Sequence, residues 1–137
     1  MNTFVVFRVS ASALEAQRQR MNVIASNMAN VHTTRTEEGG PFKRKDVVFS
    51  TLTLELNPVK LDGVQVVDIA KDNTPFKMVY DPDHPDADKD GYVAMPNVNI
   101  IEEMVNMMMA LRAYEASVSA FNISKAMFMK TLEIGRQ

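Results

Sequence analysis

The chain has 137 residues, and 15 Lys and Arg against 17 Asp and Glu give a formal net charge of −2. This balance excludes bulk attraction to nucleic acid or to an anionic membrane as the basis of function. The chain has no Cys, which excludes disulfides, thiolate metal sites and cysteine nucleophiles, and its 46% hydrophobic and 23% charged residues are typical of a globular chain. Eleven Met with no Trp indicate flexible apolar surface.

The N-terminal segment shows no targeting pattern. It lacks a basic leader, and Arg8 interrupts its apolar run, so we expect no Sec-type signal. The strongly apolar, uncharged stretch 104–111 falls well short of the roughly 20 residues that a membrane-spanning helix needs. We therefore expect a chain that does not cross a membrane.

Residues 4–31 repeat apolar side chains every seven positions, which predicts a coiled-coil-like helix. Phe7, Leu14, Met21 and Met28 form one row, and Ile24 and Val31 continue another. Asn competes for backbone hydrogen bonds, so the run SNMAN at 26–30 predicts that the helix ends near Asn30.

Residues 32–98 contain all six Pro and all but one of the five Gly, which predicts short strands joined by turns. Strands are expected at 47–49, 51–56 and 64–69, and again through Tyr92 and Val93. Turns are expected at Asn57–Pro58 and Asp62–Gly63. A polar loop rich in Asp runs from 81 to 91.

From Asn99 onward the helical period returns. One row contains Ile100, Met107, Tyr114, Phe121 and Phe128, and the next contains Met104, Leu111, Val118 and Leu132. Asn99 followed by Glu102 resembles a capping box, and Gly135 is placed to end the helix.

This C-terminal helix is too long and too apolar for one intramolecular partner. About 33–35 residues span roughly 50 Å, which exceeds the radius of gyration of roughly 14 Å for a compact globule of this size. Apolar residues also lie outside the two rows, so the helix should be buried on several faces by other chains. We predict an α+β chain with three parts: an N-terminal helix at 1–31, a β-rich insert at 32–98 and a C-terminal helix at 99–137, the two helices forming an antiparallel pair.

The run DADKDG at 86–91 resembles the start of a calcium loop, but the twelfth position is Asn97 instead of Glu. A turn in which Asp side chains cap their own backbone and Gly91 has positive φ is the preferred interpretation. A calcium-dependent interaction module remains the alternative. The chain has two His, His32 and His84, and neither has a Ser or Thr beside it in a recognisable nucleophile context. We therefore expect no catalytic residues, metal or cofactor.

Several segments resemble one family. Residues 12–30 (SALEAQRQRMNVIASNMAN) are similar to the N-terminal signature of bacterial flagellar rod, hook and hook-associated proteins. Further segments resemble the proximal rod members: GGPFKRK at 39–45, YDP at 80–82, HPDAD at 84–88, GYVAMPNVN at 91–99, EMVNM at 103–107, RAYEA at 112–116 and KTLEIG at 130–135. The resemblance covers nearly the whole chain, with Ser117 and Leu111 as local departures.

The resemblance implies a non-enzymatic subunit of the flagellar basal-body rod. Its terminal helices would pack with copies of itself and related rod proteins into a periplasmic axial tube that transmits torque and encloses the export channel. The flagellar type III apparatus would export it without a cleaved signal. Assembly is expected to rest on Leu14, Gln17, Met21, Ile24, Asn27, Met28, Asn30, Met104, Met107, Leu111, Tyr114, Val118, Phe121, Phe128 and Leu132. A different axial component is the alternative within this class.

Overall fold

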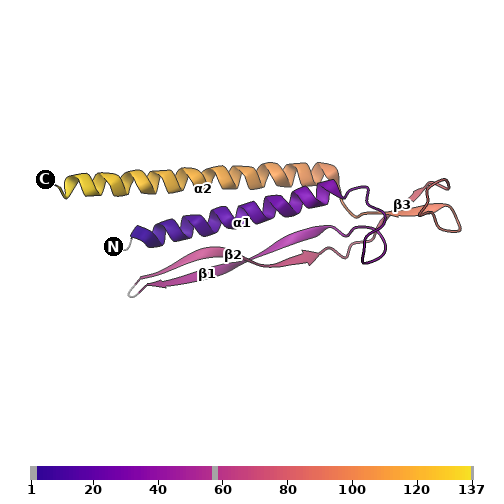
Figure 1. The fold of residues 1–137 in the computed structure, drawn as a ribbon, viewed down its shortest axis with the longest axis horizontal. Coiled ribbons are helices and arrows are strands. Elements are labelled where there is room, and N and C mark those ends of the chain that lie inside the picture. Colours follow the sequence, from indigo (N-terminus) through magenta and orange to yellow (C-terminus); the bar gives the residue numbers. More distant parts are fainter. Residues whose placement is uncertain (1–2, 57–58, 137) are drawn as a thin grey trace.

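The computed structural model describes residues 3–56 and 59–136 and confirms the α+β class. The elements follow in the order α1 (Thr3–Ala29), β1 (Lys45–Leu56), β2 (Val59–Lys71), β3 (Lys77–Tyr80), β4 (Tyr92–Met95) and α2 (Ile100–Ile134). Figure 1 shows an elongated molecule in which α1 lies between α2 and the β1–β2 hairpin. The strands β3 and β4 extend beyond the helices at the end opposite the termini.

Local sequence signals set the helix ends as predicted. α1 stops at Ala29, and the side-chain Nδ2 of Asn30 donates to the backbone carbonyl of Ser26 (2.8 Å). α2 begins after Asn99, whose side chain accepts a hydrogen bond from the Ile101 N–H (3.1 Å) and so satisfies one of the free donors at the helix start. The 35 residues of α2 agree with the predicted length.

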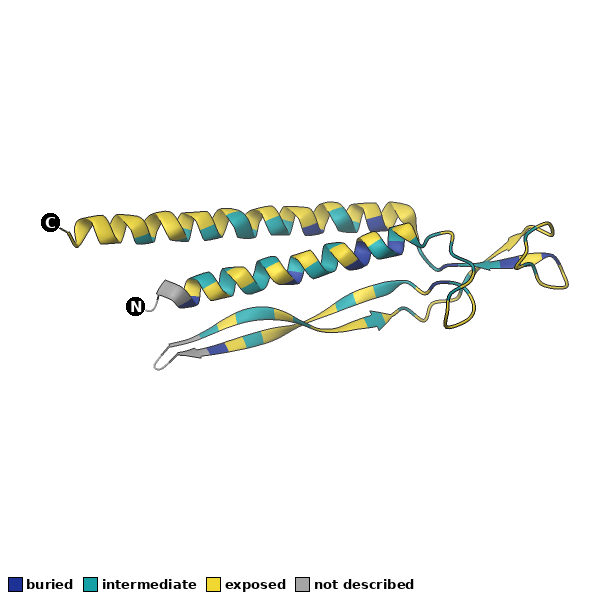
Figure 2. Cartoon of the chain, in the orientation of Figure 1, coloured by how far each residue is buried: buried dark blue, intermediate teal, exposed yellow. Residues whose placement is uncertain are grey.

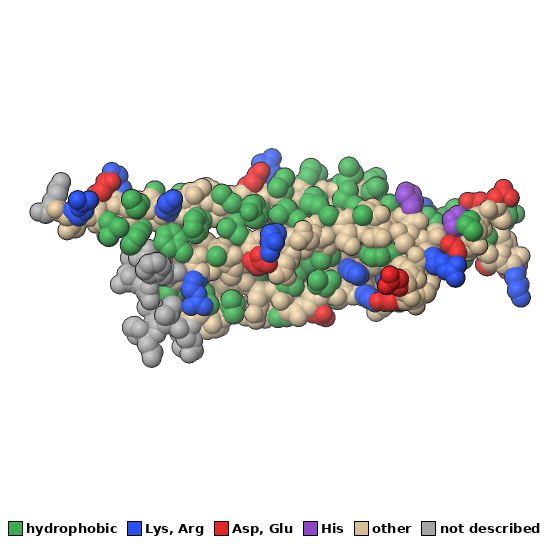
Figure 3. All heavy atoms as spheres, viewed as in Figure 1, with side chains coloured by type: hydrophobic (Ala, Val, Ile, Leu, Met, Phe, Trp, Pro, Cys, Tyr) green, Lys and Arg blue, Asp and Glu red, His purple; other side chains and the backbone are tan. Residues whose placement is uncertain are grey.

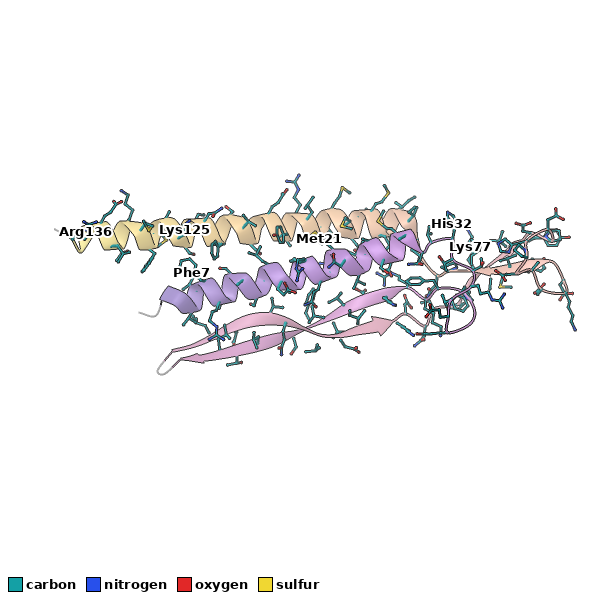
Figure 4. The ribbon with its side chains drawn as sticks, in the orientation of Figure 1. Phe7, Met21, His32, Lys77, Lys125 and Arg136 are labelled. Carbon is teal, nitrogen blue, oxygen red and sulfur yellow. The ribbon has the colours of Figure 1, made fainter. Side chains whose placement is uncertain are left out.

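The two helices run antiparallel, with both termini at one end of the molecule (Figure 1). Phe7 near the start of α1 packs against Phe121 and Phe128 of α2, with ring centroids 5.1 Å and 6.4 Å apart. At the other end of the pair, Asn27 contacts Glu103. Figure 4 labels Phe7 and Met21 on α1, along which this helix-to-helix seam runs.

The β1–β2 hairpin corrects the expectation of short strands. The predicted strands 47–49 and 51–56 form the single 12-residue β1, and β2 has 13 residues. The two strands pair antiparallel, with an irregularity in register between Val48 and Phe49. The Asn57–Pro58 turn lies outside the described residues. The Asp62–Gly63 turn is wrong, because both residues lie within β2 opposite Thr53 and Leu52.

A tertiary contact explains Gly63. A Cβ at this position would lie 2.6 Å from Oγ of Ser12 on α1, so the strand approaches the helix more closely than a side chain permits. Ser12 Oγ also accepts a hydrogen bond from the Val64 N–H (3.2 Å). The hairpin is therefore held against the face of α1 on which Val5, Ser12, Ala16 and Val23 recur. In the described part of the chain, neither hairpin strand contacts α2.

Gly63→Ala is expected to destabilise the chain by about 1–3 kcal/mol, because the new methyl group overlaps Ser12 Oγ. Adding Ser12→Ala should recover much of this loss, because the next atom would then lie 3.5 Å away. Urea unfolding of the two single variants and the double variant measures the coupling. Strictly additive effects would show that the two positions do not meet.

The strands β3 and β4 form a second antiparallel pair, of which β3 was not predicted. Tyr80 and Tyr92 stack edge to face across it, with centroids 5.3 Å apart. Gly91 has the predicted positive φ, at 81°, and a Cβ there would lie 2.9 Å from the Tyr80 ring. The loop 81–91 therefore requires glycine at this turn for both backbone and steric reasons.

Candidate assembly surface

α2 leaves most of its apolar surface uncovered. Its buried residues are Glu103 and Ala110, and the helix is coloured largely as exposed in Figure 2. In Figure 3, hydrophobic side chains gather near the start of α2 on the edge that faces away from α1, and charged side chains stand on that edge farther along. We call the exposed large apolar residues of this helix the outer face of α2: Ile100, Ile101, Met104, Val105, Met108, Met109, Leu111, Ile123, Met127, Met129, Leu132 and Ile134. These residues gather in two stretches, 100–111 and 123–134, and exposed apolar surface of this kind marks an interaction site.

Charge interrupts the outer face of α2 at a few places only. Arg112 pairs with Glu115 (3.6 Å) and Lys130 pairs with Glu133 (2.7 Å), both within the helix. Such exposed pairs contribute little to stability. Because each pair is neutral as a unit, these positions do not give the outer face a net sign that would repel a neighbouring chain.

The predicted assembly residues on α2 fall into two groups. Met107, Tyr114, Val118, Phe121 and Phe128 are half-buried along the seam with α1. Met104, Leu111 and Leu132 are exposed and belong to the outer face. The seam follows Ala110, which is completely buried, because a small side chain lets the two helices approach closely.

The predicted assembly residues on α1 are all buried or half-buried, because α2 covers one side of α1 and the hairpin covers another. These residues are Leu14, Gln17, Met21, Ile24, Asn27 and Met28, together with Asn30, which follows the last residue of α1. Ile24 and Asn27 are fully buried. These residues therefore lie inside the single chain, where they hold α2 in place.

Asn27 lies at the centre of a buried polar cluster that joins α1, α2 and the hairpin. Its Nδ2 donates to the Lys45 carbonyl (2.8 Å) and to Glu103 Oε2 (2.9 Å), and its Oδ1 accepts from the Lys45 N–H (2.9 Å). Glu103 is completely buried, and its Oε1 accepts from Nε of Arg44 (2.8 Å). Each polar atom of Asn27 and each carboxylate oxygen of Glu103 thus has a partner, as burial requires.

The cluster extends from Arg44 to the end of β2. The Arg44 N–H donates to Asn97 Oδ1 (2.8 Å), and Asn97 Nδ2 donates to the carbonyls of Asp72 (3.1 Å) and Thr74 (3.2 Å). The pKa of Arg44 is raised: burial lowers it, but its hydrogen bonds and charge interactions with Glu103 and Asp46 outweigh burial. This cluster could not be predicted from the sequence, because Glu103 resembles an ordinary acidic residue of a first helical turn and Arg44 resembles an ordinary exposed cation.

The acidic loop 81–91 is closed by its own hydrogen bonds. Asp88 Oδ1 accepts from the N–H groups of Asp90 (2.9 Å) and Tyr92 (2.8 Å). Outside the loop, Thr34 Oγ1 donates to Asp86 Oδ2 (2.8 Å) and so ties the loop to the segment after α1. His84 Nδ1 accepts from the Asp86 N–H (3.0 Å). Among residues 3–56 and 59–136, no three acidic or histidine side chains converge as metal ligands would. This geometry supports the interpretation as a self-capped turn.

Two paired terminal helices with an uncovered apolar face define a class of protein, the structural subunit of an assembly. Residues 7–35 match the family described as "Flagella basal body rod protein", and residues 89–134 match "Flagellar basal body rod FlgEFG protein C-terminal". The first match contains most of α1, and the second contains all of α2. No helix in the described ranges is long and apolar enough to span a membrane.

Curated relatives match along nearly the full length. The chain is 44% identical to the flagellar basal-body rod protein FlgC of Borreliella burgdorferi, with 98% of each chain covered. It is 44% identical to FlgC of Escherichia coli (96% of each) and 42% identical to FlgC of Bacillus subtilis (99% of this chain and 100% of the relative). The chain belongs to the FlgC family of flagellar basal-body rod proteins. It is a structural rod subunit, and neither the part of the chain that the structure describes nor these relatives support the calcium-dependent alternative.

Proposed function

We propose that this subunit enters the axial tube of the rod through the outer face of α2, which neighbouring subunits cover. The neighbours are copies of the chain and related rod proteins. The observation that carries the proposal is the set of exposed large apolar side chains in the first and last thirds of α2, at 100–111 and 123–134. At about 25 cal/mol per Å², covering ~1,000 Å² of such surface contributes at most ~25 kcal/mol, which is larger than the net stability of a typical domain.

The fifteen predicted assembly residues then act in two ways. Met104, Leu111 and Leu132 contact neighbouring subunits directly, because they are exposed in the single chain. The α1 residues and the seam residues of α2 hold the two helices in register and so present the outer face. Segments 1–31 and 99–137 thereby serve assembly, while the β-rich insert 32–98 lies towards the outside of the tube.

Membership in a rod family supports a proposal for the wider role. The rod lies within the periplasmic space, transmits torque and encloses the export channel, and its subunits leave the cell through the flagellar type III apparatus without a cleaved signal. The long helical pair supports the mechanical part of this proposal, since a hydrogen-bonded helix bundle is stiff along its axis. The protein acts without a cofactor and without catalysis.

Site-directed labelling tests the proposal, because the chain has no native Cys. Met108→Cys places a thiol on the outer face of α2, and Lys89→Cys places one in the exposed acidic loop. A soluble maleimide should label both variants equally in the free chain. In isolated rods, labelling of Cys introduced at 108 should fall at least about tenfold, because a neighbour excludes the reagent.

The Lys89→Cys variant controls for access of the reagent to assembled rods. Its labelling should stay within a few-fold of the free chain. Labelling at position 108 that is as fast in rods as in the free chain would show that the outer face of α2 remains open to solvent, which contradicts the proposal.

A further inference from the structure

The outer face of α2 is unusually rich in methionine. Five of its members are Met side chains that are between 52% and 66% exposed: Met104, Met108, Met109, Met127 and Met129. Other methionines of the helix pair, Met21, Met28 and Met107, are half-buried. Because the chain contains no Cys and no Trp, the thioethers are its side chains most open to two-electron oxidation. Exposure favours these five together with Met78, which is 54% exposed but lies on β3, away from the outer face of α2.

We propose that these five methionines form an oxidation site on the outer face of α2, at which a hydroperoxide blocks assembly of the free subunit. The inference rests on the proposed function, because it requires that neighbouring subunits dock on this face. It adds a modification site with a defined reagent class and a defined consequence.

The chemistry is a balanced oxygen transfer. The thioether sulfur attacks the distal peroxide oxygen, an S–O bond forms and the O–O bond breaks. Sulfur is oxidised by two electrons to the sulfoxide, and the peroxide is reduced to water or, for an organic hydroperoxide, to the alcohol. The product is a polar, chiral side chain where an apolar one stood, and methionine sulfoxide reductases reverse the step.

The consequence follows from burial. A sulfoxide oxygen is a strong hydrogen-bond acceptor that is satisfied by water in the free chain. Docking of an apolar neighbour would remove that water without supplying a donor, which penalises the assembled state. The exposed positions lie away from Ala110 and from the Phe7–Phe121 contact, so the chain itself should stay folded.

The order of events then matters. A free subunit exposes these sulfurs to peroxide, whereas a subunit in the rod has them covered by its neighbours. Oxidation before assembly should therefore exclude a subunit, and the same treatment after assembly should leave it in place. The methionines on the outer face of α2 are therefore sensitive to peroxide only until a neighbouring subunit covers them.

The test uses the purified full chain, mixed with the purified related rod proteins of the same organism, with assembled material measured by sedimentation. Hydrogen peroxide given before mixing should lower the pelleted fraction of this chain at least about tenfold, since several buried acceptors lose their partners together. Given after assembly, it should change the pelleted fraction little. Peptide mass mapping should place sulfoxide at the five outer-face positions and at the equally exposed Met78 before the half-buried Met21, Met28 and Met107. The circular dichroism of the treated chain should match that of the untreated chain.

Two matched variants complete the design. Replacing the five outer-face methionines by Leu conserves volume and should give a chain that assembles with or without peroxide treatment. Replacing Met21, Met28 and Met107 by Leu removes half-buried methionines and should leave the peroxide effect intact.

The outcomes separate the two proposals. If untreated wild-type chain pellets and the fully sulfoxidised chain, with its fold retained, pellets equally well, then the oxidation site is wrong while docking on α2 stands. If the five-Leu variant loses assembly on peroxide treatment, the site is also wrong, because other residues then carry the effect. If Met108→Asp leaves pelleting of the untreated chain unchanged, the proposed function itself fails.

Discussion

Replacing Leu111 with Asp is expected to abolish incorporation of the subunit into rods and leave the isolated chain folded. Leu111 is 46% exposed on the outer face of α2, so a carboxylate there is solvated in the free chain. In the assembled rod it would be enclosed by a neighbour without a counter-charge, at a cost on the order of 3–5 kcal/mol per contact. Rods counted by electron microscopy and motility of the complemented strain measure the effect.

Phe121→Asp provides the contrast, because Phe121 lies on the seam 5.1 Å from Phe7. It should lower the stability of the helix pair itself, which circular dichroism of the isolated chain detects. Leu111→Met, a volume-conserving change, should assemble normally. Normal rods and motility in the Leu111→Asp strain would rule out a buried contact at this position.

Glu103→Ala is expected to lower the free energy of unfolding of the isolated chain by about 3–5 kcal/mol. The substitution leaves the guanidinium of Arg44 without its buried carboxylate and Asn27 Nδ2 without one acceptor. Arg44 keeps Asp46 (3.2 Å) and Asp72 (3.8 Å) as ion-pair partners, and its side chain is 19% exposed. Its charge therefore stays partly compensated, and the lower end of that range applies. Urea unfolding followed by circular dichroism measures the loss.

Three variants define the cause of that loss. Glu102→Ala removes an exposed acid from the same helical turn and should change stability by about 0.5 kcal/mol or less. Glu103→Gln keeps the shape but puts an amide donor against Arg44 or Asn27, so it should fall between wild type and Glu103→Ala. Glu103→Leu combined with Arg44→Met should recover stability, because replacing both ions removes the unpaired charge. Equal losses for Glu102→Ala and Glu103→Ala would mean that the buried pair is not the cause.

The elements that could be predicted from the sequence depend on neighbours in the chain. The start of α2 after Asn99 and the end of α1 before Asn30 follow from side chains that bond to backbone groups within four residues. The positive φ of Gly91 follows from a local turn. The antiparallel helix pair follows from heptad spacing in two segments separated by a strand-rich insert.

The errors arise where a distant contact overrides a local preference. Asp62–Gly63 has the composition of a turn, but Gly63 is in β2 because only a residue without Cβ fits beside Ser12, 51 positions earlier in the chain. The heptad pattern also gave two apolar rows on α2 without deciding between them. In the structure Tyr114 is half-buried and Leu111 is exposed, because α1 packs against the side of α2 that carries the small Ala110 and the buried Glu103.

By itself the sequence determined that this protein has two long terminal helices and more apolar surface on the second than one chain can cover, because composition and periodicity are properties of the chain alone. Only the tertiary structure decided which face of α2 remains open and what holds it there. The reason is physical: Asn27, Arg44 and Glu103 are far apart in sequence, and their hydrogen bonds exist only after the helices and the hairpin have packed together.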